Sequence, residues 1–325
     1  MLVGRNRWFI GSLLALSVSG CEKRDPFIPI AAGIVTASRT ADFSDWSEPV
    51  SLGPIINGPY NDQHPALSKD GLSLFFASNR PGFGGNDIWV SHRDCLECPW
   101  QEPGNLGPPV NTDIGEAGPV LSRDEHWLFF FSARPGTVGS SDIWAAWRAD
   151  VHDDFAWQTP VNLGTGVNTT GFEGGPGYFE NDDGDGAQLF FNRNPAPVGN
   201  GGDIYVSRQA EDGTWGTAVP VAELNSAASD QRPSIAFSGL EIFFFSDRPG
   251  SMSNDIWHAT RQSVLERWGA PTNLGAPINT TVSEVHPFIY SHGRTQMLFF
   301  ARNMATPPTV EWDLFVSTRT RDGHE

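Results

Sequence analysis

Short apolar runs recur at a regular interval along this chain, and turn residues separate them. The most compact runs are aromatic, and they are centred on residues 74–76, 129–131, 189–191, 243–245 and 298–300. A strand with one solvated face would alternate apolar and polar positions, whereas these runs are apolar throughout. We therefore expect five strands that are covered on both faces.

Each aromatic run belongs to a longer repeat. Its clearest landmark is an Asp-Ile-Trp element, found with small changes at 87–89, 142–144, 203–205, 255–257 and 313–315. Each of the first four landmarks is followed by a second segment that begins with Trp, contains a Leu and leads to an Asn. An extra copy of this segment lies before the first landmark, at 46–53. The closing residues are Asn57, Asn111, Asn168, Asn225 and Asn279, which gives a period of 54 to 57 residues. A period of this length with several strands per unit is typical of a β-propeller.

The phase of the repeat predicts how the ring closes. The fifth unit, 284–319, has three strands, and its missing fourth strand matches the extra copy at 46–53. We therefore expect an all-β domain over residues 46–325. It is a five-bladed β-propeller with four-stranded antiparallel blades, and its last blade is completed by the N-terminal strand.

The pattern within each unit resembles the TolB-type, WD-repeat-like propeller repeats of bacterial envelope proteins. Residues 62–89 show the elements in order: acid-x-x-Pro, Ser-x-Asp-Gly, Leu-Phe-Phe-x-Ser-x-Arg-Pro-Gly and Asp-Ile-Trp. The resemblance covers about residues 46–319. It implies a non-catalytic platform that binds another envelope protein or a cell-wall component, such as a peptidoglycan-associated or secretion-complex partner.

The first residues carry targeting signals. Arg5 and Arg7 precede an apolar segment at 8–16 that is too short to span a bilayer, and small residues then lead to Cys21. This order resembles a lipoprotein cleavage site; an ordinary secretory signal is the alternative. We expect a signal peptide over 1–20, lipid on Cys21 and a tether over 21–45. The predicted location is the cell envelope, at the outer membrane, with the lipid as the only membrane contact.

The net charge of the chain limits the classes of partner that it can bind. Without Arg5 and Arg7, 19 basic side chains remain against 38 acidic ones, so the mature charge is near −19. This balance argues against a nucleic-acid partner. It is compatible with solubility alone, with cation binding or with a basic protein partner. We expect a monomeric propeller without a cofactor.

Two further cysteines, Cys95 and Cys98, lie in the loop before Trp100. In an oxidising compartment this pair predicts a local disulfide. Zinc binding would require further ligands, and a thioredoxin-like role would require a βαβ context.

An acidic residue begins the first strand of every unit. These residues are Asp62, Glu116, Glu173, Asp230 and Glu284. Innermost strands line the central channel of a propeller, so the five carboxylates would form a ring at one mouth that attracts cations or basic partners. Alternatively, each carboxylate accepts backbone hydrogen bonds and fixes blade packing.

Two positions after each acid, the residue type varies between units. The residues there are His64, Gly118, Gly175, Arg232 and His286. Units four, five and one are neighbours in the ring, so we expect Arg232, His286 and His64 to form a patch at the channel mouth, each beside an acid. The patch suits an anionic ligand, a sugar or a protein; a metal ion and a plain polar wall are alternatives.

The hairpin loops suggest further pairs. Arg80 precedes one such loop and Asp87 follows it, as do Arg248 and Asp255 for another. We expect structural ion pairs across these loops.

Two functions remain open. No nucleophile elbow, His-Glu-x-x-His motif or phosphate loop is present, so the main expectation is a protein that is not an enzyme. The alternative is a carbohydrate-active, glycoside hydrolase-like or sugar-binding propeller that uses channel-mouth carboxylates.

Overall fold

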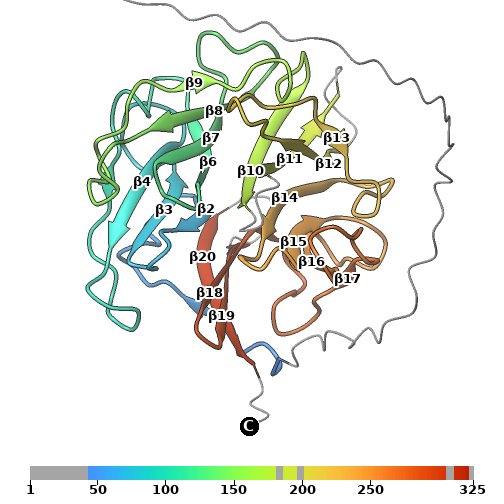
Figure 1. Cartoon of the computed structure of the whole chain (residues 1–325). Helices are drawn as coiled ribbons and strands as arrows, with labels where there is room; N and C mark the ends of the chain where they lie inside the picture. The colour runs from blue at the N-terminus through green and yellow to red at the C-terminus, as the bar shows by residue number, and fades with distance from the viewer. Residues whose placement is uncertain (1–42, 181–185, 196–200, 305–310, 322–325) are drawn as a thin grey trace, which may run out of the picture. The chain divides into compact units, whose positions relative to one another are not determined.

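The structure is a computed structural model, and it describes residues 43–180, 186–195, 201–304 and 311–321. Over these ranges the chain forms five four-stranded antiparallel sheets arranged as blades around a common axis (Figure 1). The described residues contain no helix, and hence none that is long and apolar enough to cross a membrane. The five-bladed β-propeller predicted by the repeat is confirmed.

The first four blades each take four consecutive strands, with the innermost strand first. Blade 1 comprises β2 (Asp62–Leu67), β3 (Ser73–Ser78), β4 (Asp87–His92) and β5 (Gly104–Asn105). Blade 2 comprises β6 (Glu116–Leu121), β7 (Trp127–Ser132), β8 (Asp142–Trp147) and β9 (Val161–Asn162). Blade 3 comprises β10 (Phe172–Glu180), β11 (Ala187–Asn194), β12 (Asp203–Arg208) and β13 (Val219–Pro220). Blade 4 comprises β14 (Asp230–Ile235), β15 (Glu241–Ser246), β16 (Asp255–Thr260) and β17 (Thr272–Asn273).

Blade 5 combines both ends of the propeller. Its strands are β18 (Glu284–His292), β19 (Thr295–Asn303), β20 (Trp312–Thr320) and β1 (Val50–Ser51). The outermost strand β1 pairs antiparallel with β20, so that Val50 lies opposite Val316. The predicted closure by the N-terminal strand is therefore confirmed.

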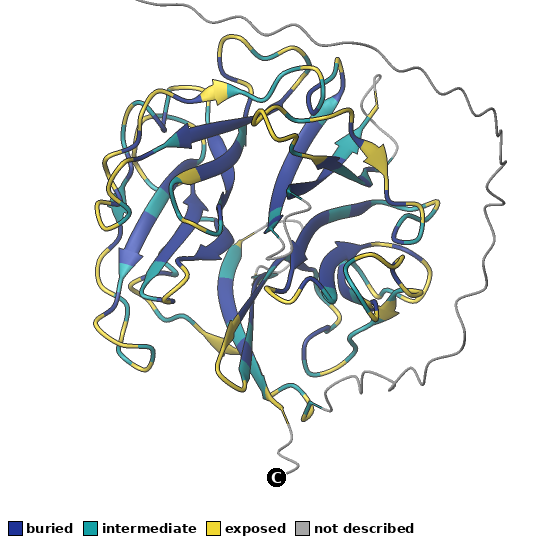
Figure 2. Ribbon diagram, in the orientation of Figure 1, coloured by how far each residue is buried: buried dark blue, intermediate teal, exposed yellow. Residues whose placement is uncertain are grey.

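The aromatic runs form the core between blades. Phe75 and Phe76 of β3 are both fully buried. Phe75 belongs to a cluster that includes Phe130 of blade 2, whereas Phe76 belongs to one that includes Leu314 of blade 5. Successive side chains thus pack on opposite neighbours, which explains why the runs do not alternate with polar residues. Burial of each Phe contributes roughly 1.5–3 kcal/mol, and Figure 2 shows the inner strands as largely buried.

Every innermost strand carries a bulge at the residue before its proline. The pairing register shifts there in all five blades. The residues concerned have left-handed backbone angles: His64 (φ 57°), Gly118 (71°), Gly175 (58°), Arg232 (54°) and His286 (55°). The five prolines that follow surround a cavity of only ≈ 30 Å³ on the axis. They separate the mouth at the starts of the inner strands (the strand-start mouth) from a pocket at their ends.

Candidate functional site

The five strand-start acids are buried in ion pairs. Each carboxylate meets an arginine from the end of the second strand of its own blade, and each acid side chain is 0% exposed. The pairs are Asp62–Arg80 (2.6 Å), Glu116–Arg134 (2.9 Å), Glu173–Arg193 (2.8 Å), Asp230–Arg248 and Glu284–Arg302 (2.8 Å). The acids therefore do not present an open ring of negative charge to the channel.

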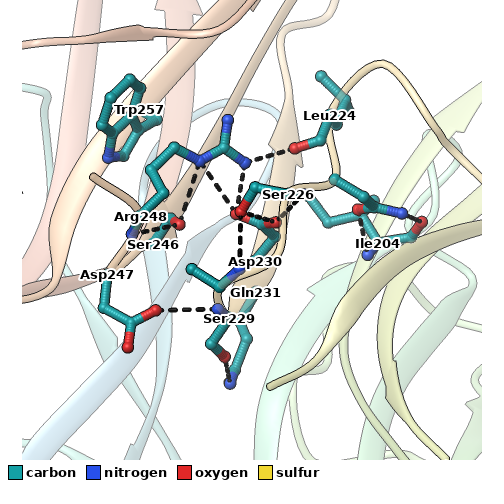
Figure 3. Close-up of polar contacts among 12 residues, drawn as sticks. Ile204, Leu224, Ser226, Ser229, Asp230, Gln231, Ser246, Asp247, Arg248 and Trp257 are labelled. Atoms are coloured by element: carbon teal, nitrogen blue, oxygen red, sulfur yellow. Dashed lines mark hydrogen bonds and ion pairs between the residues drawn. The ribbon is translucent and has the colours of Figure 1, made fainter. Parts of the chain in front are cut away.

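Figure 3 shows the pair in blade 4. Asp230 accepts hydrogen bonds from the Ser226 backbone N–H (2.6 Å) and hydroxyl (2.9 Å), as well as from Arg248. The Arg248 guanidinium also donates to the backbone carbonyl of Leu224 and lies 5.1 Å from the centre of the Trp257 ring. Such a satisfied network fixes the packing of the blade and leaves no carboxylate oxygen for a ligand.

The expected ion pairs across the hairpin loops were wrong. Arg80 pairs with Asp62 instead of Asp87, and Arg248 pairs with Asp230 instead of Asp255. Asp87 accepts the Phe83 backbone N–H (2.7 Å) and the Asn105 amide (2.7 Å), so it closes the loop as an acceptor. The guanidinium groups point toward the inner strand, where the buried carboxylate would otherwise lack compensation.

The strand-start mouth brings together the three side chains that interrupt the repeat. The rings of His64 and His286 stack with centroids 3.6 Å apart. Arg232 extends from blade 4 toward blades 2 and 3, because a Cβ atom at Gly118 would lie 2.2 Å from its Nη1 and one at Gly175 would lie 2.4 Å from its Cδ. All five blades thus contribute to one cluster around Arg232 at the axis.

The cluster keeps a single charge at neutral pH. Burial lowers the pKa of Arg232 to about 9, so its guanidinium stays protonated. Burial, followed by the charge of Arg232, lowers the pKa of both His64 and His286 well below the usual range, so both imidazoles are neutral. Among the described residues, no three His, Cys, Asp or Glu side chains lie close enough to hold a metal ion.

The opposite end of the axis holds a larger cavity, the strand-end pocket. Its volume is ≈ 320 Å³, and all five blades line it. The lining comes from the last residues of the inner strands and the turns after them, at 67–69, 120–123 with Glu125, 178–180, 235–237 and 288–291. Apolar and aromatic side chains form most of this wall, and Glu125, Glu180, Lys69 and Arg123 supply charge.

Glu125 occupies a strained turn position in this pocket. Its φ is 62°, whereas the other four blades place Gly71, Gly186, Gly239 and Gly293 at the equivalent left-handed position. Its carboxylate accepts the Lys69 backbone N–H of blade 1 (2.7 Å). Burial raises the pKa of Glu125, and this effect exceeds the opposing hydrogen bond from Lys69. A left-handed non-glycine residue costs of the order of 1–3 kcal/mol, and such strain clusters at functional sites.

The second acid of the pocket, Glu180, lies in blade 3. It accepts the Tyr178 hydroxyl (2.9 Å), and burial, followed by the charge of Glu180, raises the pKa of Tyr178 so that the phenol stays protonated. Within the described ranges, neither Glu125 nor Glu180 forms an ion pair with an arginine or lysine, in contrast to the strand-start acids.

Glu125 and Glu180 were not among the site residues expected from the sequence, although the sequence does contain a signal for Glu125. The turn reads Ser68-Lys69-Asp70-Gly71 in blade 1 and Ser122-Arg123-Asp124-Glu125 in blade 2. The repeat favours glycine at this position because the backbone is left-handed there. A glutamate at such a position is an exception, and the exception is the signal for a functional residue. Glu180 has no comparable signal, because only the ring brings it beside this turn.

The cysteines fall into two groups. Cys95 and Cys98 form a disulfide across three positions. Cys21, with the whole proposed signal peptide and tether up to residue 42, lies outside the described residues.

Comparisons with known proteins give the architecture a context. No protein-family model matches the chain, and no curated protein matches it. Among solved structures, it is similar to a thermostable family-43 glycoside hydrolase at 13% identity and a TM-score of 0.59, over 83% of this chain and 97% of that one. An α-L-arabinofuranosidase from Podospora anserina matches at 12% identity and 0.56, over 84% and 96%. An endo-arabinanase from Bacillus licheniformis matches at 16% identity and 0.53, over 80% and 94%.

These neighbours correct the functional expectations. The three solved structures named above are glycoside hydrolases, so the resemblance to TolB-type repeats was wrong. The same finding contradicts the expected non-enzymatic, protein-binding platform and favours the carbohydrate-active alternative. The repeat led to the wrong functional expectation because its aromatic strands and acid–Arg pairs stabilise the packing of the blades. These features carry no information about a ligand. At these identities the likeness itself establishes the fold, a five-bladed β-propeller.

Proposed function

We propose that this protein is a carbohydrate-active propeller that hydrolyses a glycosidic bond in the strand-end pocket, with Glu125 as the general acid. The observation that carries the proposal is the half-buried Glu125 carboxyl group with its raised pKa, held at the pocket wall at a backbone position that favours glycine. A carboxyl group that keeps its proton at higher pH is what protonation of a leaving-group oxygen requires.

Glu180 supplies the second carboxylate that glycoside hydrolysis needs. Retaining and inverting enzymes both use two carboxyl groups, one to protonate the leaving oxygen and one to attack the sugar or activate water. Here the two acids come from blades 2 and 3, and burial raises the pKa of Glu125. Non-equivalent acids in one pocket suit two different roles, which the five equivalent strand-start acids do not.

The wall of the pocket suits a sugar. Phe237 is an exposed aromatic side chain at its edge, and the Arg123 guanidinium lies 4.5 Å from the centre of that ring. Tyr178 and Tyr290 add aromatic surface together with hydroxyl groups. Pockets that combine apolar surface with a few directed polar groups are typical of small-ligand sites. Sugars present both kinds of surface, since their C–H faces are apolar and their edges carry hydroxyls.

The first substrates to test follow from the structural neighbours, which include arabinofuranosidases and arabinanases. The experiment incubates the protein with arabinan, arabinoxylan and a panel of aryl glycosides and measures released reducing sugar. We expect cleavage of at least one substrate by the wild type. Glu125→Gln, which keeps an acceptor for the Lys69 N–H, should lower the rate by about 10²- to 10⁴-fold.

A matched control separates catalysis from folding. Glu266 is an exposed glutamate in blade 4, so Glu266→Gln should leave the rate unchanged. The wild type should also lose activity as rising pH deprotonates Glu125. The residual activity of Glu125→Gln should not show this decrease with rising pH. Absence of cleavage across the panel, or equal rates for wild type and Glu125→Gln, would contradict the proposal.

A further inference from the structure

The strand-start mouth contains a buried positive charge without a described partner. Arg232 is 8% exposed, and its Nη1 has no hydrogen-bond partner among the described residues. The Nδ1 atoms of His64 and His286 are likewise buried and unsatisfied there. Asp230, the acid two positions before Arg232 in the same strand, is paired with Arg248. Native interiors rarely leave a buried guanidinium uncompensated, because the desolvation cost is large.

The chain holds this charge in place by special backbone features. His64, Arg232 and His286 all adopt left-handed angles on the inner-strand bulges, where glycine is preferred. At the two remaining bulges glycine is present, and a Cβ atom there would collide with Arg232. Three side chains are therefore kept at strained backbone positions. The two positions that Arg232 passes, Gly118 and Gly175, have no side chain.

We propose that the strand-start mouth is an anion site in which Arg232 binds a carboxylate group, and in which His64 and His286 add neutral hydrogen-bonding groups. A guanidinium presents parallel N–H donors that match the two oxygens of a carboxylate. This site lies on the far side of the proline constriction from the strand-end pocket, so it is independent of the proposed hydrolytic function.

The charge of the cluster selects the class of anion. One protonated guanidinium between two neutral imidazoles gives a net charge of +1. A carboxylate monoanion compensates that charge, whereas a sulfate or phosphate dianion would leave an excess negative charge at the site. A metal cation is disfavoured because Arg232 would repel it.

Aromatic side chains around the cluster suit the part of the ligand to which the carboxylate is attached. Phe131 packs edge-on against His64 (5.7 Å), Phe245 packs edge-on against His286 (5.4 Å), and Trp312 lies 6.3 Å from His286. Phe131 and Trp312 are half-buried, so part of each ring remains open. A carboxylate on an aromatic or sugar ring fits this surface better than a free small anion.

Isothermal titration calorimetry in low-chloride buffer, with acetate, benzoate and D-glucuronate as probes, tests the site. We expect at least one carboxylate to bind at one site per chain, with D-glucose as the neutral analogue giving no heat. Arg232→Gln should weaken binding on the order of 10- to 100-fold, because it removes a charged hydrogen-bonding partner. Its melting temperature without ligand should equal or exceed that of the wild type, because an uncompensated buried charge is gone.

Two control variants make the outcome specific. Arg267→Gln removes an exposed arginine in blade 4 and should bind as the wild type does. Glu125→Gln should also bind normally, which separates this site from the strand-end pocket. The proposal is overturned if no carboxylate binds, if Arg232→Gln binds as tightly as the wild type, or if sulfate binds more tightly than every carboxylate.

Discussion

At the scale of single residues, an asparagine side chain takes the place of a missing stretch of strand in each blade. The Ile88 N–H donates to Asn111 Oδ1 (2.9 Å), and Asn111 Nδ2 donates to the Ile88 carbonyl (2.9 Å). The same two hydrogen bonds join four further pairs, namely Asn168–Ile143, Asn225–Ile204, Asn279–Ile256 and Asn57–Leu314. The outermost strands are only two residues long in all five blades, so this amide supplies the pairing that the short strand lacks.

Replacement of this asparagine should destabilise the propeller. Asn111→Leu leaves the buried Ile88 N–H without a partner, whereas the Ile88 carbonyl keeps the Leu106 N–H (3.1 Å), so the change should cost roughly 1–3 kcal/mol in the free energy of unfolding. Urea unfolding followed by tryptophan fluorescence measures the change. Asn225 makes the same bonds but is half-buried, so Asn225→Leu should cost less, because water can replace the amide. Equal costs for the two variants would argue against the assigned role.

The acid–arginine pairs predict a second residue-scale effect. Arg248→Met leaves Asp230 buried without its counter-charge, so we expect a loss of about 3–5 kcal/mol in the free energy of unfolding. The double variant Arg248→Met/Asp230→Leu removes the uncompensated charge and should recover part of the loss. Chemical denaturation of both variants measures the two values, and a double variant less stable than Arg248→Met would refute this account.

At the scale of elements, blade 5 is fastened to blade 4 through Arg319 of β20. Its guanidinium pairs with Glu241 at the start of β15, and it lies 4.2 Å and 4.5 Å from the ring centres of Phe43 and Trp46. One side chain thus connects the closing segment, the last long strand and the neighbouring blade. Burial alone would raise the pKa of Glu241, but the His258 hydrogen bond, the charge of Arg319 and the Gln296 hydrogen bond together lower it to about 2.

This carboxylate should make closure sensitive to acid. Its pKa is lower in the folded state than the ordinary 4.5, so its stabilising effect is full above pH 4.5 and is lost as the pH falls toward 2. The effect is roughly 3 kcal/mol at neutral pH. Unfolding free energies of wild type and Glu241→Gln should therefore differ at pH 7 and converge near pH 2. A difference that does not change between these pH values would show that the ionisation of Glu241 is not responsible.

The strands and their order were predictable because packing on both faces demands aromatic runs at a fixed interval. The partner of Arg80 was not, because both Asp62 and Asp87 are within reach along the sequence, and only burial decides between them. The grouping of Arg232 with His64 followed from their equivalent positions in the repeat, whereas the absence of a counter-charge needed the three-dimensional structure. Glu180 could not be linked to Glu125, because no sequence spacing relates the ends of β10 to the turn after β6.

At the scale of the whole molecule, the axis carries two separate chemistries. The prolines of the inner strands leave a cavity of only ≈ 30 Å³ between the cationic strand-start mouth and the strand-end pocket with its two glutamates. Because no wide passage joins them, ligands at the two ends would bind independently. The inner strands are rigid and shared by both sites, and rigid elements hold functional groups more accurately than loops do.

The attachment of the molecule to a membrane remains a prediction from the sequence. If Cys21 is lipidated, the protein expressed with its first 20 residues should incorporate labelled palmitate and enter the detergent phase on Triton X-114 partitioning. Cys21→Ala should lose both properties and leave the fold unchanged. Labelling that persists in Cys21→Ala would place the lipid elsewhere, and an unlabelled wild type would favour the ordinary secretory signal.

The closure of blade 5 also brings together the first and last residues that the structure describes. Phe43 forms a backbone bridge with Arg321, so the first and last described residues of the propeller are neighbours. A short linker could therefore join them, and new termini could be opened in the loop between two other blades. In such a circular permutant, β20 would run directly into β1, all four strands of blade 5 would be consecutive, and the ring would keep every contact described above.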